Sequence, residues 1–174
     1  TPGGEFSEYV WNQMNAREIL RFTGPLGSFF LREDSDRPII LVATGTGFAP
    51  IKGMLEHAFA RNIQRKIVLY WGTRNLPEMY MRELPQRWQD EHANFTFIPV
   101  LSEPLEVDGW QGRVGLVHEV VLEDHGSFAP YQVYACGAPV MVEAAHEAFT
   151  ARGLPHEEFY SDAFFASKDG RKPR

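Results

Sequence analysis

The stretch LVATGTGFAPIKG, residues 41–53, decides the fold. It predicts a buried strand, then a turn made of Gly45, Thr46 and Gly47, then a helix with Pro50 in its first turn. Glycine lets a backbone approach a ligand closely, and a helix start offers free amides to a pyrophosphate. The turn lacks the Gly-Lys-Ser/Thr of a P-loop, and Pro50 replaces the third glycine of the G-x-G-x-x-G pattern. It is therefore either a less usual nucleotide-binding turn or an ordinary connection between strand and helix.

Strand-like and helix-like segments alternate along the rest of the chain. A continuous apolar run predicts a strand at 38–44, and further strands are predicted at 66–72, 95–101 and 131–137, with 157–164 as a possible fifth strand. Amphipathic segments predict helices at 48–62, 77–91 (interrupted before Pro85), 115–124 and 139–153. This alternation predicts an α/β fold with a five-stranded, parallel, doubly wound sheet. In such sheets ligands lie at the carboxyl ends of the strands, so sites are expected just after the first four strands.

The first part of the chain has a different character. Segments 17–25 and 27–33 predict two short strands, as at the end of a β domain, and the polar stretch 33–38 ends in a proline that marks a boundary. The tail carries four basic residues and predicts either a solvated end or a contact for an acidic partner. The predicted parts are a truncated β domain (1–36), a nucleotide-binding domain (37–165) and a flexible basic tail (166–174).

Composition narrows the classes of function. The chain has 174 residues and a formal net charge of -6, which argues against a nucleic-acid binder. A single cysteine, Cys136, rules out an intramolecular disulfide and a cysteine-held iron–sulfur cluster within this sequence. The six histidines are scattered, so no metal site is predicted. No apolar run has the length of a membrane span, and we expect a reducing, cytoplasmic setting.

Polar donors follow the second predicted strand. A typical NAD site carries an acidic residue here, which binds the ribose hydroxyls. This chain has Gly72, Thr73 and Arg74 instead. A guanidinium makes charge-assisted hydrogen bonds to a phosphate, so Arg74 favours NADPH over NADH. The alternative, a solvated surface arginine, stays open.

The third and fourth strands also end in candidate turns. Ser102 follows the third strand and could bind a nucleotide, and Arg113 further on could neutralise one or lie in solvent. A second glycine turn, Cys136-Gly137-Ala138-Pro139, follows the fourth strand and is expected to face the first turn. Cys136 is either a small packed residue or a group beside a reacting ring.

Five motifs in fixed order, GTGFAP, YWGTRN, LSEP…GWQGRVG, YACGAPVMV and EEFYSDAF, resemble the ferredoxin–NADP reductase-like superfamily over nearly the whole chain. Within it the chain is most similar to bacterial CDP-6-deoxy-glucoseen reductases and to reductase components of oxygenases. The resemblance implies that residues 1–36 are the last strands of an antiparallel FAD-binding β-barrel, in which Gly4, Phe6 and Ser7 hold the FAD pyrophosphate. It also implies a C-terminal fragment with an incomplete FAD site, and a [2Fe–2S] cluster only in a missing domain.

The same resemblance implies hydride transfer from nicotinamide to FAD, and electron transfer onward to an iron–sulfur centre or partner protein. Thr46 and Pro50 would line the nicotinamide side, and Cys136 would lie beside the reacting carbon. Phe164, or Phe165, would cover the flavin. The glycine turns, together with Pro139 and Met141, would complete the nucleotide site. The alternative is a nucleotide-binding or docking module with no redox turnover of its own.

Overall fold

A computed structural model of the chain describes residues 4–24 and 26–164. They fall into two compact units, one that ends at Ser28 and one that spans Phe29–Phe164. The larger unit holds the sheet and its helices. The tail predicted at 166–174, and Phe165, lie outside the described residues.

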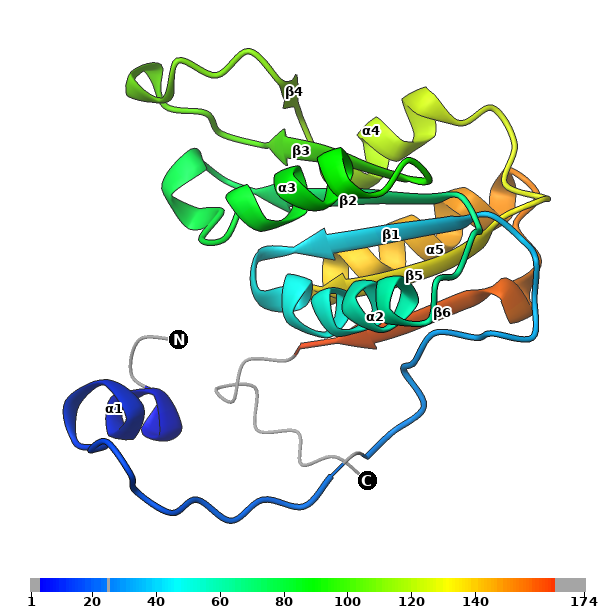
Figure 1. Ribbon diagram of the computed structural model, residues 1–174. Helices are drawn as coiled ribbons and strands as arrows, with labels where there is room; N and C mark the ends of the chain where they lie inside the picture. The colour runs from blue at the N-terminus through cyan, green and yellow to red at the C-terminus, as the bar shows by residue number, and fades with distance from the viewer. Residues whose placement is uncertain (1–3, 25, 165–174) are drawn as a thin grey trace. The chain divides into compact units, whose positions relative to one another are not determined.

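The larger unit is built on one parallel sheet of six strands, in the order β4-β3-β2-β1-β5-β6 (Figure 1). β1 lies beside both β2 and β5, so the strand order reverses direction there. The carboxyl ends of β1 and β5 therefore flank the point where a doubly wound sheet binds its ligand. The strands are β1 Ile39–Thr44, β2 Ile67–Thr73, β3 Phe95–Leu101, β4 Arg113–Val114, β5 Gln132–Gly137 and β6 Phe159–Ala163.

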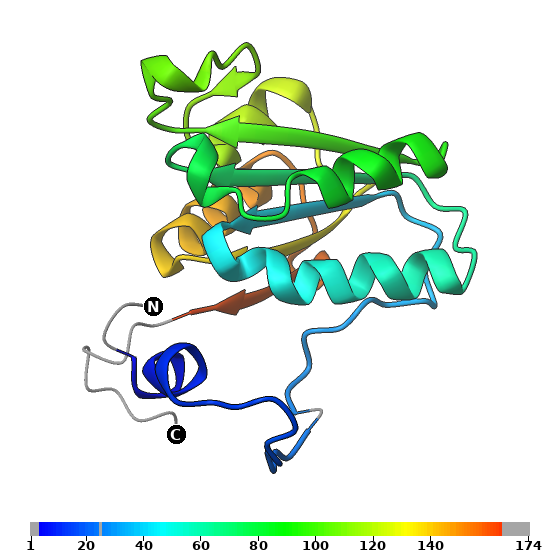
Figure 2. The ribbon, with the colours of Figure 1, turned by 60° about the vertical axis from the view of Figure 1, so that its left-hand side comes forward.

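Helices cover both faces of this sheet. α2 (Phe48–Ala60) and α3 (Glu83–Glu91) cover one face, while α4 (Val117–Asp124) and α5 (Pro139–Ala151) cover the other (Figures 1 and 2). Two apolar cores result, one on each side. Burial on both faces explains why β1 and β5 read as continuous apolar runs rather than alternating patterns.

The doubly wound parallel sheet is confirmed, with differences in its elements. The sheet has one strand more than the five predicted. This additional strand, β4, is only two residues long and carries no apolar run that a pattern could detect. The helix predicted over 77–91 forms as a single 3₁₀ turn, η2 (Leu76–Glu78), followed by α3. Pro85 lies in the first turn of α3, where a missing amide hydrogen costs no helical bond.

The two strands predicted at 17–25 and 27–33 do not form in the described residues. A strand needs a neighbour, and no strand of the described residues pairs with this segment. The apolar side chains of the first predicted strand are exposed, with Ile19 at 94% and Phe22 at 89%. Among its described residues, the smaller unit contains instead one helix, α1 (Glu5–Asn12). The barrel itself therefore stays a prediction.

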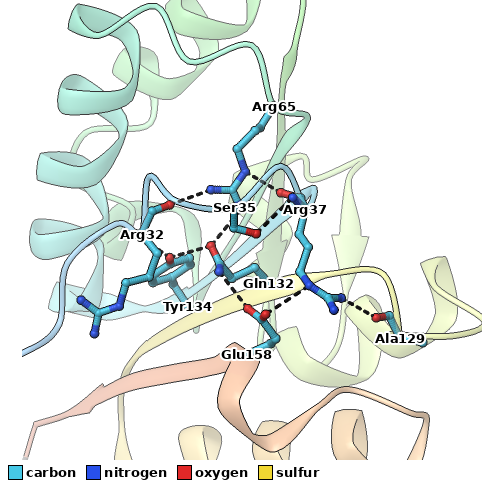
Figure 3. Close-up of polar contacts among 8 residues, drawn as sticks. All are labelled: Arg32, Ser35, Arg37, Arg65, Ala129, Gln132, Tyr134 and Glu158. Atoms are coloured by element: carbon cyan, nitrogen blue, oxygen red, sulfur yellow. Dashed lines mark hydrogen bonds and ion pairs between the residues drawn. The ribbon is translucent and has the colours of Figure 1, made fainter.

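The segment just before β1 belongs to the α/β unit, because Leu31 is buried in the same core as β1 and α2. Figure 3 shows Arg65 at the centre of its attachment. The guanidinium of Arg65 donates hydrogen bonds to the carbonyls of Arg32 and Arg37 and to the side-chain oxygen of Gln132 on β5. One planar cation thus joins the incoming chain to the sheet.

Gln132 extends this network toward β6. Its amide nitrogen donates to Glu158, and its amide oxygen also accepts from the hydroxyl of Tyr134. Glu158 in turn pairs with the guanidinium of Arg37 at 3.1 Å (Figure 3). The side chains of Arg65, Gln132, Tyr134, Glu158 and Arg37 are each paired within this partly buried cluster, and paired polar networks of this kind stabilise a fold.

Arg65→Ala should lower the free energy of unfolding by about 2–3 kcal/mol, because two carbonyls and a glutamine oxygen lose a charged donor. Urea denaturation followed by circular dichroism measures this. Arg61→Ala is the matched control: that side chain is 66% exposed and its nearest contact with Glu33 is 3.5 Å, so its unfolding midpoint should not move. Equal losses in the two variants would contradict the role given to Arg65.

Candidate functional site

An open cavity of about 480 Å³ lies where the sheet changes strand order. Its volume is within the range of small-molecule sites. The ends of β1, β2 and β3 form its floor, and the first turns of α4 and α5 form its walls. It is lined by Thr44, Gly45, Gly72, Thr73, Arg74, Glu78, Ser102, Gly115, Leu116, Val117, His118, Ala138, Val140, Met141 and Ala144.

The two predicted glycine turns meet at this cavity. A Cβ added to Gly47 would lie 2.1 Å from the carbonyl oxygen of Cys136, and one added to Gly137 would lie 2.1 Å from the Thr44 hydroxyl. The Thr44 hydroxyl also accepts a 3.0 Å hydrogen bond from the amide of Ala138. These two glycines are therefore required by the contact between the turns rather than by direct contact with a ligand.

Gly45 has the opposite role. A Cβ added there would meet nothing within 4 Å, so its backbone faces open space, and its φ is +50°. Its carbonyl accepts a 3.1 Å hydrogen bond from the indole of Trp71, which stacks on Phe48 with ring centroids 4.0 Å apart. Trp71 thus holds the η1 turn in place, and Gly45 is the glycine of this turn that lines the cavity.

The structure brings together part of the predicted site. Six predicted residues line the cavity: Gly45, Gly72, Thr73, Arg74, Ser102 and Met141. Thr46 is exposed on the η1 turn (Gly45–Gly47), and Pro50 lines a different hollow beside Phe29 and Phe30. Pro139 begins α5 but does not line the cavity. Gly4, Phe6 and Ser7 belong to the smaller unit, where Gly4 precedes α1 and the other two lie within it.

Cys136 begins the second glycine turn, and Phe164 lies next to it. The amide of Phe164 donates a 2.9 Å hydrogen bond to the carbonyl of Gly137, and its side chain is 41% exposed. Cys136 is fully buried between β1 and β6, opposite Ala43 and Asp162. Burial, with a smaller contribution from the charge of Asp162, raises the pKa of the Cys136 thiol to about 12. The thiol is therefore neutral at physiological pH.

Arg74, predicted to contact a 2′-phosphate, lines the cavity and is paired. Its guanidinium contacts the carboxylate of Glu78 at 2.7 Å. Nothing in the sequence pattern pointed to Glu78, which the helical pattern placed in the helix 77–91. Arg113, also considered for the nucleotide, makes 2.7 and 2.6 Å ion pairs with Asp124 and Glu123 at the end of α4 and does not line the cavity.

The sequence missed the wall made by the start of α4. Gly115, Leu116, Val117 and His118 line the cavity there, directly after the short strand β4. A Cβ added to Gly72 would come within 2.9 Å of Val117, so this helix packs tightly on the end of β2. The glycines of GWQGRVG (109–115) indicated a turn, but they did not indicate that the helix after it would pack on β2 and line the cavity.

Within 4–24 and 26–164, no three histidine, cysteine or acidic side chains are placed so that they could hold a metal ion. No helix in this part of the chain is long and apolar enough to cross a membrane.

A doubly wound parallel sheet with glycine turns and a cavity at its switch point defines a nucleotide-binding α/β domain. The family model described as oxidoreductase NAD-binding domain matches residues 41–147. The chain belongs to this family, and the predicted resemblance to ferredoxin–NADP reductase-like proteins is confirmed.

Similar proteins agree with this assignment. The chain is 40% identical to a CDP-6-deoxy-L-threo-D-glycero-4-hexulose-3-dehydrase reductase of Yersinia pestis, over 95% of this chain and 49% of the relative. It is 34% identical to an NAD(P)H-flavin reductase of Aliivibrio fischeri, over 92% of this chain and 67% of the relative. The crystal structure of the Amycolatopsis cytochrome P450 reductase GcoB superposes with a TM-score of 0.84 at 32% identity, over 94% of this chain and 50% of that chain. The chain thus spans about half the length of several relatives.

Gly47→Ala should destabilise the fold by about 2–3 kcal/mol, because its Cβ would collide with backbone that cannot move without separating the two turns. Thermal or urea unfolding measures this. Gly53→Ala is the control: it lies in α2 with nothing within 4 Å of an added Cβ, and should stabilise the helix by about 0.5–1 kcal/mol. A neutral Gly47→Ala would disprove the close contact.

Cys136 should make stability fall at alkaline pH. Its pKa is raised from 9.0 to about 12, so its contribution is complete below pH 9 and is lost as the pH rises toward 12. The unfolding free energy of the wild type should therefore fall by about 1 kcal/mol more between pH 8 and pH 10 than that of Cys136→Ala. Urea denaturation at the two pH values tests this, and identical pH dependences would contradict it.

Proposed function

We propose that the chain is the NAD(P)H-binding part of a flavoprotein reductase, which passes hydride from nicotinamide to FAD and electrons on to an iron–sulfur centre or partner protein. The observation that carries this proposal is the cavity at the strand-order switch, with an open glycine at its floor and a helix start at its wall. The names of similar proteins, NAD(P)H-flavin reductase and dioxygenase reductase component, support the flavin and electron-transfer parts.

The cavity fits a dinucleotide by its chemistry. The exposed backbone at Gly45 and the first turn of α5 would hold the pyrophosphate, because helix starts attract anions. Leu116, Val117 and Met141 supply apolar wall for a flat ring. Thr73 and Ser102 add hydroxyls close to the end of β2.

The reacting end of the dinucleotide would lie toward the second glycine turn. When bound, the nicotinamide supplies the hydride. The chain's own contribution there is a neutral, buried thiol at Cys136 and a partly exposed aromatic ring at Phe164, joined through the backbone of Gly137. Both side chains are uncharged, so they shape the site without competing for a proton. Thr46 and Pro50 remain proposed neighbours of the nicotinamide.

The FAD half of the reaction rests on the smaller unit. Gly4 precedes α1, whose first residues are Glu5 and Phe6, and this would offer backbone amides to the FAD pyrophosphate. The acidic residues Glu5 and Glu8 in the first turn weaken that site electrostatically.

A [2Fe–2S] partner, an acceptor protein and a cytoplasmic setting belong to the same proposal. The alternative is a dinucleotide-binding module without redox turnover, and a calorimetric titration with flavin and nicotinamide separates the two.

Val140→Asp should weaken the binding of both NAD⁺ and NADP⁺ by about tenfold or more, because it places a carboxylate at the helix start that faces the pyrophosphate. Val140 is 73% exposed, so the fold should not change. Val107→Asp is the matched control, 88% exposed on a turn outside the cavity. Isothermal titration calorimetry measures both. Unchanged binding in Val140→Asp would place the dinucleotide elsewhere.

A further inference from the structure

The carboxylate of Glu78 lies near the end of β2, where the sequence pattern showed no acidic residue. β2 ends at Thr73, and the next residues, Arg74 and Asn75, are not acidic. The η2 turn (Leu76–Glu78) then brings the carboxylate of Glu78 back to the cavity wall, beside Arg74. The two Glu78 oxygens lie 2.7 Å from Nη2 and 3.4 Å from Nε of Arg74. The end of β2 therefore presents a carboxylate after all.

This turn is held in place on several sides. The hydroxyl of Thr73 donates a 2.9 Å hydrogen bond to the carbonyl of Asn75, and the amide of Leu76 donates to the carboxylate of Asp108 at 3.2 Å. Met79, directly after Glu78, is buried in the core. Glu78 is thus positioned by the fold rather than by its pairing with Arg74 alone.

The formal charge around Arg74 is negative, because the carboxylates of Glu78 and Glu103 both act on this one guanidinium. Hydrogen bonding and the charge of Glu78 raise the pKa of Arg74, and the charge of Glu103 adds to this. The amide of Glu103 also donates a 2.7 Å hydrogen bond to the Arg74 carbonyl, so these two backbones are fixed together. Among the cavity-lining residues, Arg74 and His118 are the only ones with basic side chains. A 2′-phosphate entering here would meet two carboxylates around one arginine.

We infer that Glu78 makes this site select NAD(H) over NADP(H), by accepting hydrogen bonds from the adenosine ribose hydroxyls and by neutralising Arg74. This inference rests on the proposed dinucleotide site and reverses the preference suggested by Arg74 in the sequence. An acidic residue at the end of the second strand binds the ribose hydroxyls in NAD sites, and its charge repels a phosphate at the same position.

The pairing with Arg74 is weak enough to be replaced. The side chain of Arg74 is 68% exposed and that of Glu78 is 37% exposed, and exposed ion pairs of this kind contribute little. Without the carboxylate, Arg74 is free to contact a 2′-phosphate. The specificity therefore depends on Glu78, while Arg74 supplies the latent phosphate contact.

Calorimetric titration of the chain with NAD⁺ and with NADP⁺ tests this. The wild type should bind NAD⁺ about tenfold or more tightly than NADP⁺, and Glu78→Gln should reduce that ratio by about tenfold, mainly through tighter NADP⁺ binding. Glu78→Gln combined with Arg74→Ala should not gain NADP⁺ affinity. Glu56→Gln, which alters another exposed i,i+4 pair outside the cavity, is the matched control and should keep the wild-type ratio.

The outcomes separate this inference from the proposed function. Binding of NAD⁺ and NADP⁺ with equal affinity, a preference for NADP⁺, or a ratio unchanged by Glu78→Gln would overturn the role of Glu78 and leave the dinucleotide site standing. Failure of every variant to bind either dinucleotide, with the fold intact by circular dichroism, would overturn both.

Discussion

The contact between the η1 turn and the end of β5 is the constraint on which the site depends. Gly47 packs on the carbonyl of Cys136, Gly137 packs on Thr44, and the Thr44 hydroxyl accepts from the amide of Ala138. Side chains at either glycine would separate the two turns. The contact aligns the starts of α2 and α5 across the switch point. Of the glycines in these two turns, Gly45 is the one that lines the cavity.

Much of the fold could be predicted because three central strands, β1, β2 and β5, are buried along nearly their whole length and are mostly apolar. β3 is only partly buried, with Thr96 exposed, but its apolar residues still outnumber the polar ones. The sequence could not predict β4, because a two-residue edge strand owes its existence to β3 and not to its own composition. The strands predicted at 17–25 and 27–33 do not form in the described residues, because β propensity produces a strand only where a partner strand is present.

The candidate site could be predicted at positions where the backbone conformation requires a particular residue type. Gly45 and Gly72 could be found because glycine marks close approach, and Thr73 and Arg74 because they follow directly on a strand. Glu78, Leu116 and His118 could not, because only the path of η2 and the packing of α4 bring them to the cavity. The chemistry of Arg74 was also hidden, since a side chain's charge environment depends on neighbours that a linear pattern does not reveal.

The position of β1 at the centre of the sheet has a consequence for the order of folding. β1 pairs with β2 through the nearby α2 connection, but it also pairs with β5, and Thr44 and Ala138 are 94 residues apart in sequence. Contacts of such long range form late, because the chain must first close a large loop. During synthesis β1, β2, β3 and the helices between them can assemble while β5 and the cavity wall at the start of α5 are still absent. A ligand in this cavity therefore stabilises the unit only once both β1 and β5 are in place.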